Sequence, residues 1–436
     1  MKRMLLVLLA LVFIYPMISI GAEKDSINLK LVWEKEIPQG VKDFVFLDEN
    51  GYNVFSVQCK NPEKALKEKR ILVVQGNKLV WYEGDEMRVV KEMTIGKGSS
   101  NENKVVISKN GRNIAILNGL YVPTIKDKDY DEYKGTYRNQ LATLRLLNWK
   151  GEELARTQFS PGHLDYIDLF SLGNDSTVIL NLSGGEGLYY TVWMFLRNGS
   201  ELKKVFSSDG YIWTYAENGS IMLVSELQKK RLIMDGSGKN VGGFSYSNPR
   251  GNYWAGISPK GNYIAEVTTG KSVVIHNKYG TLISEHHVQG QGNYYGAFSP
   301  DEKYLCMTPG PWRVYFFETE TGKMLWEYVD TLSRYRSIAI DSQGDNIFLS
   351  STLFHHTDLS LQESAKKYLI VFNHVGEMIG KEIVSLVKTH EELEFYRWKS
   401  ITPPVRITND GEYLMVRLPS KLQLYHIMRG GKDETN

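Results

Sequence analysis

The sequence predicts an all-β fold, a single β-propeller built from four-stranded antiparallel blades. Two observations predict it: a turn-and-strand unit that repeats along the chain, and a second turn that recurs late in that unit. The clearest copy runs from Phe298 to Tyr328. A Ser-Pro-Asp turn, a TPGP break and a Thr-Gly turn divide this copy into four short β-prone runs. Four such strands in a meander form one propeller blade.

Copies of the first turn recur along the chain, and each follows an apolar residue that serves as its anchor. Successive anchors are separated by 61, 63, 45, 42, 41, 42 and 67 residues. The four middle steps match a blade period of roughly 40–45 residues, and the longer steps require inserted loops. The anchors are Phe46, Ile107, Phe170, Tyr215, Ile257, Phe298, Ile340 and Ile407.

The second turn contains a glycine and keeps its place within the unit. Two signals in the same phase are harder to obtain by chance than one, so together they favour a repeat architecture. The second turns are NWKGEEL from Asn148, LRNGSEL from Leu196, NKYGTLI from Asn277, ETGKMLW over Glu320–Trp326 and NHVGEMI from Asn373.

The end of the chain leaves the last blade one strand short. After Ile407 only three β-prone segments remain. The segment 28–37, before the first anchor, is expected to supply the fourth strand and so to close the ring and remove its open edges. This arrangement gives eight blades within residues 23–430. Seven blades are the alternative, because the Phe46 unit holds one β-prone run too many among 71–75, 78–83 and 87–93.

The N-terminus has the three parts of a secretory signal peptide, expected over residues 1–22. Lys2 and Arg3 precede an apolar run over 4–14, and small residues follow, so the cut is expected after Gly21 or Ala22. The apolar run is short for a membrane span, although an uncleaved anchor reaching residue 20 is the alternative. No cysteine lies near the cut for lipid attachment. The sequence therefore predicts a secreted or periplasmic protein without a later membrane span, with a disordered tail over 431–436.

Composition narrows the class of partner and the redox chemistry. The chain has 436 residues and a formal net charge of +2, without a concentrated basic face, so nucleic acid is not an expected partner. Of its two cysteines, Cys59 and Cys306, each is placed at the end of the second strand of its blade, in blades one and six. Those positions are far apart around the ring, so two free, mostly buried thiols are expected. The chain is expected to be a monomer.

The turns ISPKGNYI (Ile257–Ile264) and FSPDEKYL (Phe298–Leu305) resemble those of WD-repeat-like and YVTN-type β-propellers, although the Trp-Asp ending of true WD repeats is absent. The resemblance covers nearly the whole mature chain and implies the fold. ETGKMLWEY (Glu320–Tyr328) is similar to the tryptophan-docking repeat of quinoprotein propellers, in which Gly and Trp of adjacent blades interlock. That family carries pyrroloquinoline quinone under a vicinal cysteine pair. This chain has no such pair, so no cofactor is expected.

Long, varied loops between strands two and three and between blades share one face of the predicted ring. Loops on a rigid scaffold concentrate binding residues, and Arg with Tyr and Trp is typical of protein-binding surfaces and of stacking on sugars. We therefore predict a non-enzymatic propeller that binds a protein, peptide or glycan there, although such aromatics also pack between blades. The predicted binding residues are Arg250, Tyr253, Trp254, Tyr294, Tyr295, Arg334, Tyr335, Arg336, Tyr396, Arg397 and Trp398.

Catalysis is the alternative function, at a site in the central channel. It would be a quinone-dependent oxidoreductase, or a polysaccharide hydrolase or lyase using carboxylates near the loop face. Those carboxylates are Asp165, Asp168, Glu186 and Glu285. His286 and His355 are weak metal candidates, because adjacent histidines in a strand point to opposite sides and no zinc-binding spacing supports them. No metal is therefore expected, and the identity of the ligand and the presence of catalysis stay open.

Overall fold

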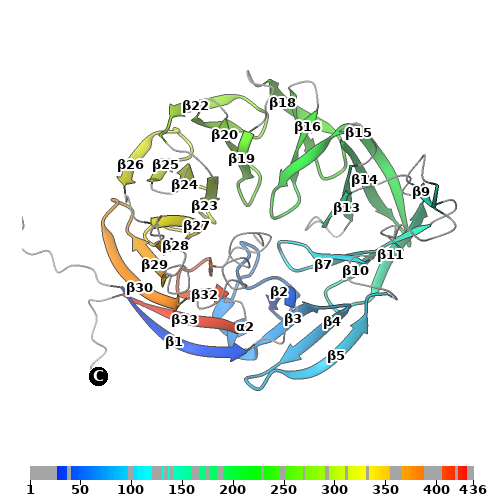
Figure 1. Ribbon diagram of the computed structural model, residues 1–436, viewed down its shortest axis with the longest axis horizontal. Helices are drawn as coiled ribbons and strands as arrows, with labels where there is room; N and C mark the ends of the chain where they lie inside the picture. The colour runs from blue at the N-terminus through cyan, green and yellow to red at the C-terminus, as the bar shows by residue number, and fades with distance from the viewer. Residues whose placement is uncertain are drawn as a thin grey trace, which may run out of the picture.

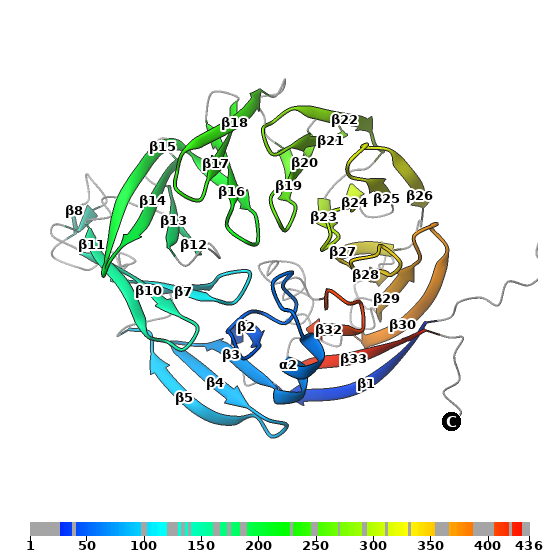
Figure 2. The same cartoon turned by 180° about the vertical axis from the view of Figure 1, so that it is seen from behind.

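The computed structural model shows a ring of β-sheets around a central axis (Figures 1 and 2). Each unit of the ring is antiparallel and runs from an inner strand outward, as a blade does. The structure describes residues 27–36, 41–96, 103–119, 130–131, 136–137, 141–159, 166–171, 176–183, 190–226, 230–245, 252–268, 271–289, 294–309, 313–329, 333–353, 366–386, 405–417 and 421–429.

Among these residues the strands group into eight four-stranded units. Five units are separate sheets, and an eleven-stranded sheet holds three more, because the long strand β15 is shared by two units and meets β11 through one parallel bridge. This grouping is compatible with the eight blades expected. We number the blades from the first complete one along the chain.

Blades 1 to 4 are formed by the first half of the chain. A short hairpin between the second and third strands of blade 2 pairs β8 with β9. The elements are β2 (Val41–Leu47), α2 (Pro62–Glu68), β3 (Arg70–Gln75), β4 (Lys78–Glu83) and β5 (Arg88–Thr94); β6 (Lys104–Ile107), β7 (Asn113–Asn118), β8 (Tyr130–Asp131), β9 (Thr136–Tyr137), β10 (Ala142–Asn148) and β11 (Glu153–Phe159); β12 (Tyr166–Ser171), β13 (Thr177–Ser183), β14 (Tyr190–Asn198) and β15 (Glu201–Tyr215); and β16 (Ile221–Glu226), β17 (Lys230–Asp235) and β18 (Asn240–Ser245).

Blades 5 to 8 follow in order, and the last blade takes its outer strand from the N-terminus. The elements are β19 (Asn252–Ile257), β20 (Tyr263–Thr268), β21 (Ser272–Asn277) and β22 (Leu282–His287); β23 (Tyr294–Phe298), β24 (Tyr304–Pro309), β25 (Arg313–Glu318) and β26 (Met324–Val329); β27 (Ser333–Ile340), β28 (Ile347–Leu353), β29 (Lys366–Phe372) and β30 (Met378–Leu386); and β31 (Val405–Ile407), β32 (Tyr413–Arg417), β33 (Lys421–Arg429) and β1 (Ile27–Glu36).

The ring is closed by the N-terminal strand, which confirms that expectation. β1 pairs antiparallel with β33 from Ile27 opposite Arg429 to Glu36 opposite Lys421. Trp33 is buried in the same apolar cluster as Phe46 of blade 1 and Met415 of blade 8. The two ends of the chain therefore share one core, and β33 is not left as an unpaired outer edge of a three-stranded blade.

The repeated first turn is held by the same hydrogen bond in several blades. The hydroxyl of Ser258 accepts from the backbone N–H of Tyr263 at 3.0 Å, and Ser299 and Thr408 do the same for the residue five positions on. The turn needs a left-handed residue, which is usually glycine. Gly261 fills this position at φ +85, whereas Glu302 fills it at φ +73 in blade 6.

The second turn of a blade docks against the preceding blade. The ring of Trp326 covers Gly376 of blade 7, where an added Cβ would lie 2.9 Å from the indole, and its Nε1 donates to the carbonyl of His374 at 2.9 Å. Trp81 covers Gly151 in the same way and donates to the carbonyl of Trp149 at 2.8 Å. Gly and Trp of adjacent blades therefore interlock at these two positions.

Blade 1 differs from its predicted strands. The segment that follows Phe46 was expected to turn and return as the second strand, but residues 48–69 form an insertion that contains α2, and β3 is the second strand. Only an isolated bridge joins Leu47 to Asn53. The run that counted as one strand too many is thereby accounted for, because β3, β4 and β5 complete the blade.

Both cysteines are buried and free, as expected. Cys306 lies on the second strand of blade 6, but Cys59 lies in the insertion rather than on a strand, because the second strand of blade 1 begins at Arg70. Burial raises the pKa of the Cys59 thiol to about 11 and also raises that of Cys306. No helix in the described part of the chain is long and apolar enough to cross a membrane.

Candidate functional site

The described aromatic residues of the predicted binding face lie at the start of inner strands and pack between blades. Tyr294 and Tyr335 are buried, with 8% and 2% of their surface exposed. Trp254 is partly buried, and its ring lies over Gly256 and Gly296, where an added Cβ would approach it within 2.4 and 2.6 Å. These glycines make room for the indole between blades 5 and 6, and Tyr295 packs similarly between blades 6 and 7.

The remaining predicted binding residues have side chains that lie outside the described part of the structure. Tyr253, Arg334 and Arg336 lie in β19 and β27, and their side chains are outside the described set. Arg250, Tyr396, Arg397, Trp398 and the metal candidate His355 lie outside the described residues.

The second metal candidate, His286, lies on β22, the outer strand of blade 5. Its Nε2 is 2.6 Å from the carbonyl oxygen of Gly322 in blade 6, and its ring packs against Phe317. The described residues contain no group of three His, Cys, Asp or Glu side chains arranged to hold a metal ion. His286 thus takes part in the contact between two blades.

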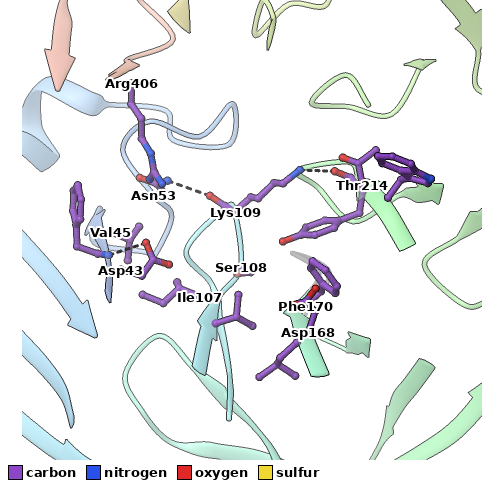
Figure 3. A pocket seen from close by; sticks show the side chains of 15 residues that line it. Asp43, Val45, Asn53, Ile107, Ser108, Lys109, Asp168, Phe170, Thr214 and Arg406 are labelled. Atoms are coloured by element: carbon purple, nitrogen blue, oxygen red, sulfur yellow. Dashed lines mark hydrogen bonds between the residues drawn. The ribbon is translucent and has the colours of Figure 1, made fainter. Parts of the chain in front are cut away.

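A pocket of about 490 Å³ lies within the ring, surrounded by inner strands (Figure 3). β2, β6, β12, β15 and β31 contribute to its walls, so five different blades meet there. Both apolar and charged side chains line it. The lining residues are Asp43, Phe44, Val45, Asn53, Val106, Ile107, Ser108, Lys109, Asp168, Leu169, Phe170, Trp213, Thr214, Tyr215 and Arg406.

Lys109 crosses from blade 2 to blade 4 at this pocket. Its Nζ donates to the carbonyl oxygen of Tyr215 at 2.7 Å and lies 4.2 Å from the centre of the Tyr215 ring (Figure 3). The side chain is exposed to the pocket, yet protein surrounds the pocket, so desolvation lowers the pKa of Lys109 to about 8 against the opposing attraction of Glu217. Burial similarly raises the pKa of Tyr215.

Arg406 enters the same pocket from blade 8. Its guanidinium lies 5.8 Å from the centre of the Phe44 ring. Burial lowers the pKa of Arg406, and the nearby charges of Asp43 and Glu217 oppose this shift. One carboxylate oxygen of Asp43 accepts from the backbone N–H of Phe44 at 2.8 Å. The pocket therefore holds charges of both signs beside aromatic rings.

The blade 1 insertion lies across one end of this pocket. The carboxylate of Glu217, in blade 4, accepts from the N–H of Val57 at 3.0 Å, and burial raises the pKa of that carboxyl. Asn409 of blade 8 donates to the carbonyl of Ser56 at 2.7 Å, and Asn110 of blade 2 donates to Gln58 at 2.7 Å. Three blades thus hold the insertion over the centre of the ring, as Figure 2 shows for the segment between β2 and α2.

Sequence reasoning missed most of this pocket. Only Asp168 was among the carboxylates noted, and it was placed near the loop face rather than within the channel. A usable signal did exist, because Lys109 lies two residues after the anchor Ile107, in the turn that follows an inner strand, and Arg406 lies next to the anchor Ile407. Residues flanking an anchor lie at the inner strand and so line the channel.

Comparisons with solved structures show that the fold is that of known β-propellers. The chain is similar to BamB from Moraxella catarrhalis, which is 10% identical, with 92% of this chain and 100% of that chain covered and a TM-score of 0.51. Sqt1 from Saccharomyces cerevisiae is 10% identical over 92% and 99%, with a TM-score of 0.51. The C-terminal WD40 domain of Sif2 is 8% identical over 92% and 98%, with a TM-score of 0.54.

No protein-family model matches the sequence, and the comparison with curated proteins gives no match. The structural likeness establishes a WD40-like β-propeller and, at these identities, the fold alone. A propeller scaffold serves many unrelated functions, so the function has to be argued from the sites of this chain.

Proposed function

We propose that the protein is an exported, non-enzymatic β-propeller that binds a protein, peptide or glycan partner on the face that carries its long loops. The observation behind this proposal is the difference between the two faces of the ring. Connections between second and third strands and between blades include the segments 119–141, 354–365 and 387–404. On the opposite face most connections are short, such as 258–262 and 299–303.

Long connections on a rigid scaffold are a feature of binding faces. The segment 387–404 carries Tyr396, Arg397 and Trp398, and the connection 246–251 between blades 4 and 5 carries Arg250; these residue types are enriched among binding hot spots. Trp254 and Tyr295 are partly buried at the start of β19 and β23, and they pack between blades. The expected binding contribution comes from the loop residues rather than from these packed rings.

Partner capture from the host compartment tests this function. We compare the wild-type chain with a loop-face variant carrying Arg250→Ala, Arg397→Ala and Trp398→Ala, using chemical crosslinking followed by identification of the captured molecules. A matched control on the opposite connections carries Lys260→Ala, Lys303→Ala and Tyr279→Ala, all exposed. We expect one partner to be retained by the control and lost by the loop-face variant. Equal capture by both variants would overturn the proposed face.

Export is tested separately, by the N-terminal sequence of the protein purified from its host. We expect it to begin at Ala22 or Glu23, because small residues precede both positions. A chain that retains Met1 and stays with the membrane fraction would instead support an uncleaved anchor.

A further inference from the structure

Two charged side chains of the central pocket make no hydrogen bond or ion pair within the described part of the chain. They are the guanidinium of Arg406 and the carboxylate of Asp168, which enter from β31 and β12 on different sides of the pocket (Figure 3). Buried or half-buried charges are normally paired, because leaving water without a partner is costly. Lys109 adds further donors, since its ammonium has three N–H groups and one of them is used on Tyr215.

The rest of the pocket suits an apolar group of modest size. Phe44, Phe170, Trp213 and Tyr215 supply aromatic surface, and Val106 and Leu169 supply aliphatic surface. A volume of about 490 Å³ lies within the range of small-molecule sites, roughly 300–1,000 Å³. Because the blade 1 insertion lies across one end, a ligand here would be enclosed on that side.

The balance of charge argues against a simple ion. Asp43 and Asp168 offset Lys109 and Arg406, so the four charged lining residues carry no net charge. A lone anion at Arg406 would lie near Asp43, and a lone cation at Asp168 would leave Arg406 without a partner. A ligand with one pole of each sign satisfies both side chains.

We propose that the central pocket binds a small zwitterionic amino compound with an apolar side chain, its carboxylate at Arg406 and Lys109 and its ammonium at Asp168. A free amino acid and a short peptide share this chemistry. The site is distinct from the loop face, and its occupant would contact the inner strands of blades 3 and 8 and the first turn of blade 2.

Isothermal titration calorimetry on the full mature chain tests the ligand chemistry first. The probes are L-leucine, L-phenylalanine and the dipeptide Leu-Leu, and the analogues are phenylpropionate, which lacks the ammonium, and phenylethylamine, which lacks the carboxylate. We expect at least one probe to bind and both analogues to bind at least tenfold more weakly. Preference for the dipeptide identifies a short peptide as the source, and preference for the single residues identifies a free amino acid. Equal binding of an analogue, or no binding of any probe at millimolar concentration, overturns the proposal.

Substitutions then test the location. Arg406→Met and Asp168→Asn should each weaken binding of the best probe at least tenfold, whereas the exposed controls Arg88→Met and Asp209→Asn should leave it unchanged. Unchanged thermal melting shows that the pocket variants are folded, and Arg406→Lys, which keeps the positive charge, should restore part of the affinity. Full affinity in both pocket variants would place the site elsewhere and overturn the proposal. The loop-face variant should bind the probe normally, so failure of the proposed function and failure of this site give different results.

Discussion

Blades 5 and 6 and blade 1 use the same connection, between the first and second strands, in opposite ways. In blades 5 and 6 it is a five-residue turn that closes locally, and the carboxylate of Glu302 accepts hydrogen bonds from Ser258, Lys260 and Asn262 of the preceding blade, at 2.6, 2.7 and 2.6 Å. In blade 1 it is the insertion 48–69, whose backbone is held by blades 2, 4 and 8.

The two kinds of connection therefore have different roles: one stabilises the contact between blades, and the other covers the central pocket. The regular turn joins neighbours and locks two blades, so its polar groups serve the stability of the ring. The insertion joins blades that are not neighbours, and it lies over the pocket. The connection between the first and second strands is short in every other described blade, and it is long only in blade 1, where it lies over the central pocket.

The largest expected effect on stability is at the contact between blades 4 and 5. Arg231 of blade 4 and Glu266 of blade 5 are fully buried, and Nε of the arginine lies 2.8 Å from Oε1 of the glutamate. Arg231→Met should lower the free energy of unfolding by roughly 3–5 kcal/mol, because it leaves the Glu266 charge buried without this partner. Urea denaturation measures the change.

The exposed pair Lys78–Glu92 in blade 1 supplies the control, at 2.8 Å and about half exposed on each side. Lys78→Met should cost under about 1 kcal/mol, because solvent screens exposed pairs. Equal losses in the two variants would contradict the assignment of stability to the buried pair between blades 4 and 5.

A smaller effect is expected at the docked second turn. Gly376 has φ +86 and lies against the Trp326 ring, whereas Gly84 has φ +77 and open space around it. Each substitution by alanine should cost about 1–2 kcal/mol for the left-handed backbone. Gly376→Ala should cost about 1–3 kcal/mol more, because the new methyl group displaces the indole.

Thermal unfolding of the two glycine variants gives this difference directly, since the backbone contribution is shared. A red shift of tryptophan fluorescence in Gly376→Ala, absent in Gly84→Ala, would confirm that the Trp326 contact is what changes. If both variants lose the same stability, the interlock between blades 6 and 7 contributes nothing measurable.

The smallest effect is expected at the insertion, and it depends on pH. Burial raises the pKa of Glu217 above its ordinary value of 4.5, so the folded state binds this proton more tightly than the unfolded state. Stability should therefore fall as the pH rises from about 4.5 toward the raised pKa. Glu217→Gln keeps an acceptor for Val57 and removes the titration.

Urea denaturation of wild type and Glu217→Gln between pH 4 and 7 measures the free energy of unfolding at each pH. The difference between the two chains should change with pH as expected for the titration of a single carboxyl group. We expect the variant to gain stability relative to wild type as the pH increases. A difference between the two chains that stays constant over this range would show that the buried state of Glu217 does not contribute.

Local chemistry explains which features could be predicted. The anchors Ile257 and Phe298 each lie in the first strand of a blade, because an apolar residue before a Ser-containing turn is a local pattern. Blade 1 was misread after Phe46 because residues 52–57 are β-prone but have no strand partner beyond one bridge. The pairing of a segment depends on its neighbours in space, which the β-propensity of its own residues does not determine.

The candidate site shows the same division. Trp254, Tyr294 and Tyr335 were predicted for a binding face from their residue types, yet the described structure packs them between blades, since an aromatic ring serves burial and recognition equally well in sequence. Lys109 and Arg406 carried no motif. They matter because closure of the ring brings residues about three hundred positions apart to one pocket.

By itself the sequence determined the all-β class, the repeating turns and the closing strand, since each depends on residues close together in the chain or on a simple strand count. Only the tertiary structure decided that residues 48–69 lie over the centre, that Arg231 meets Glu266, and that Arg406 and Asp168 share a pocket. The physical reason is that a propeller closes through contacts between distant segments, and the charges that such contacts leave without partners are visible only once the ring is formed.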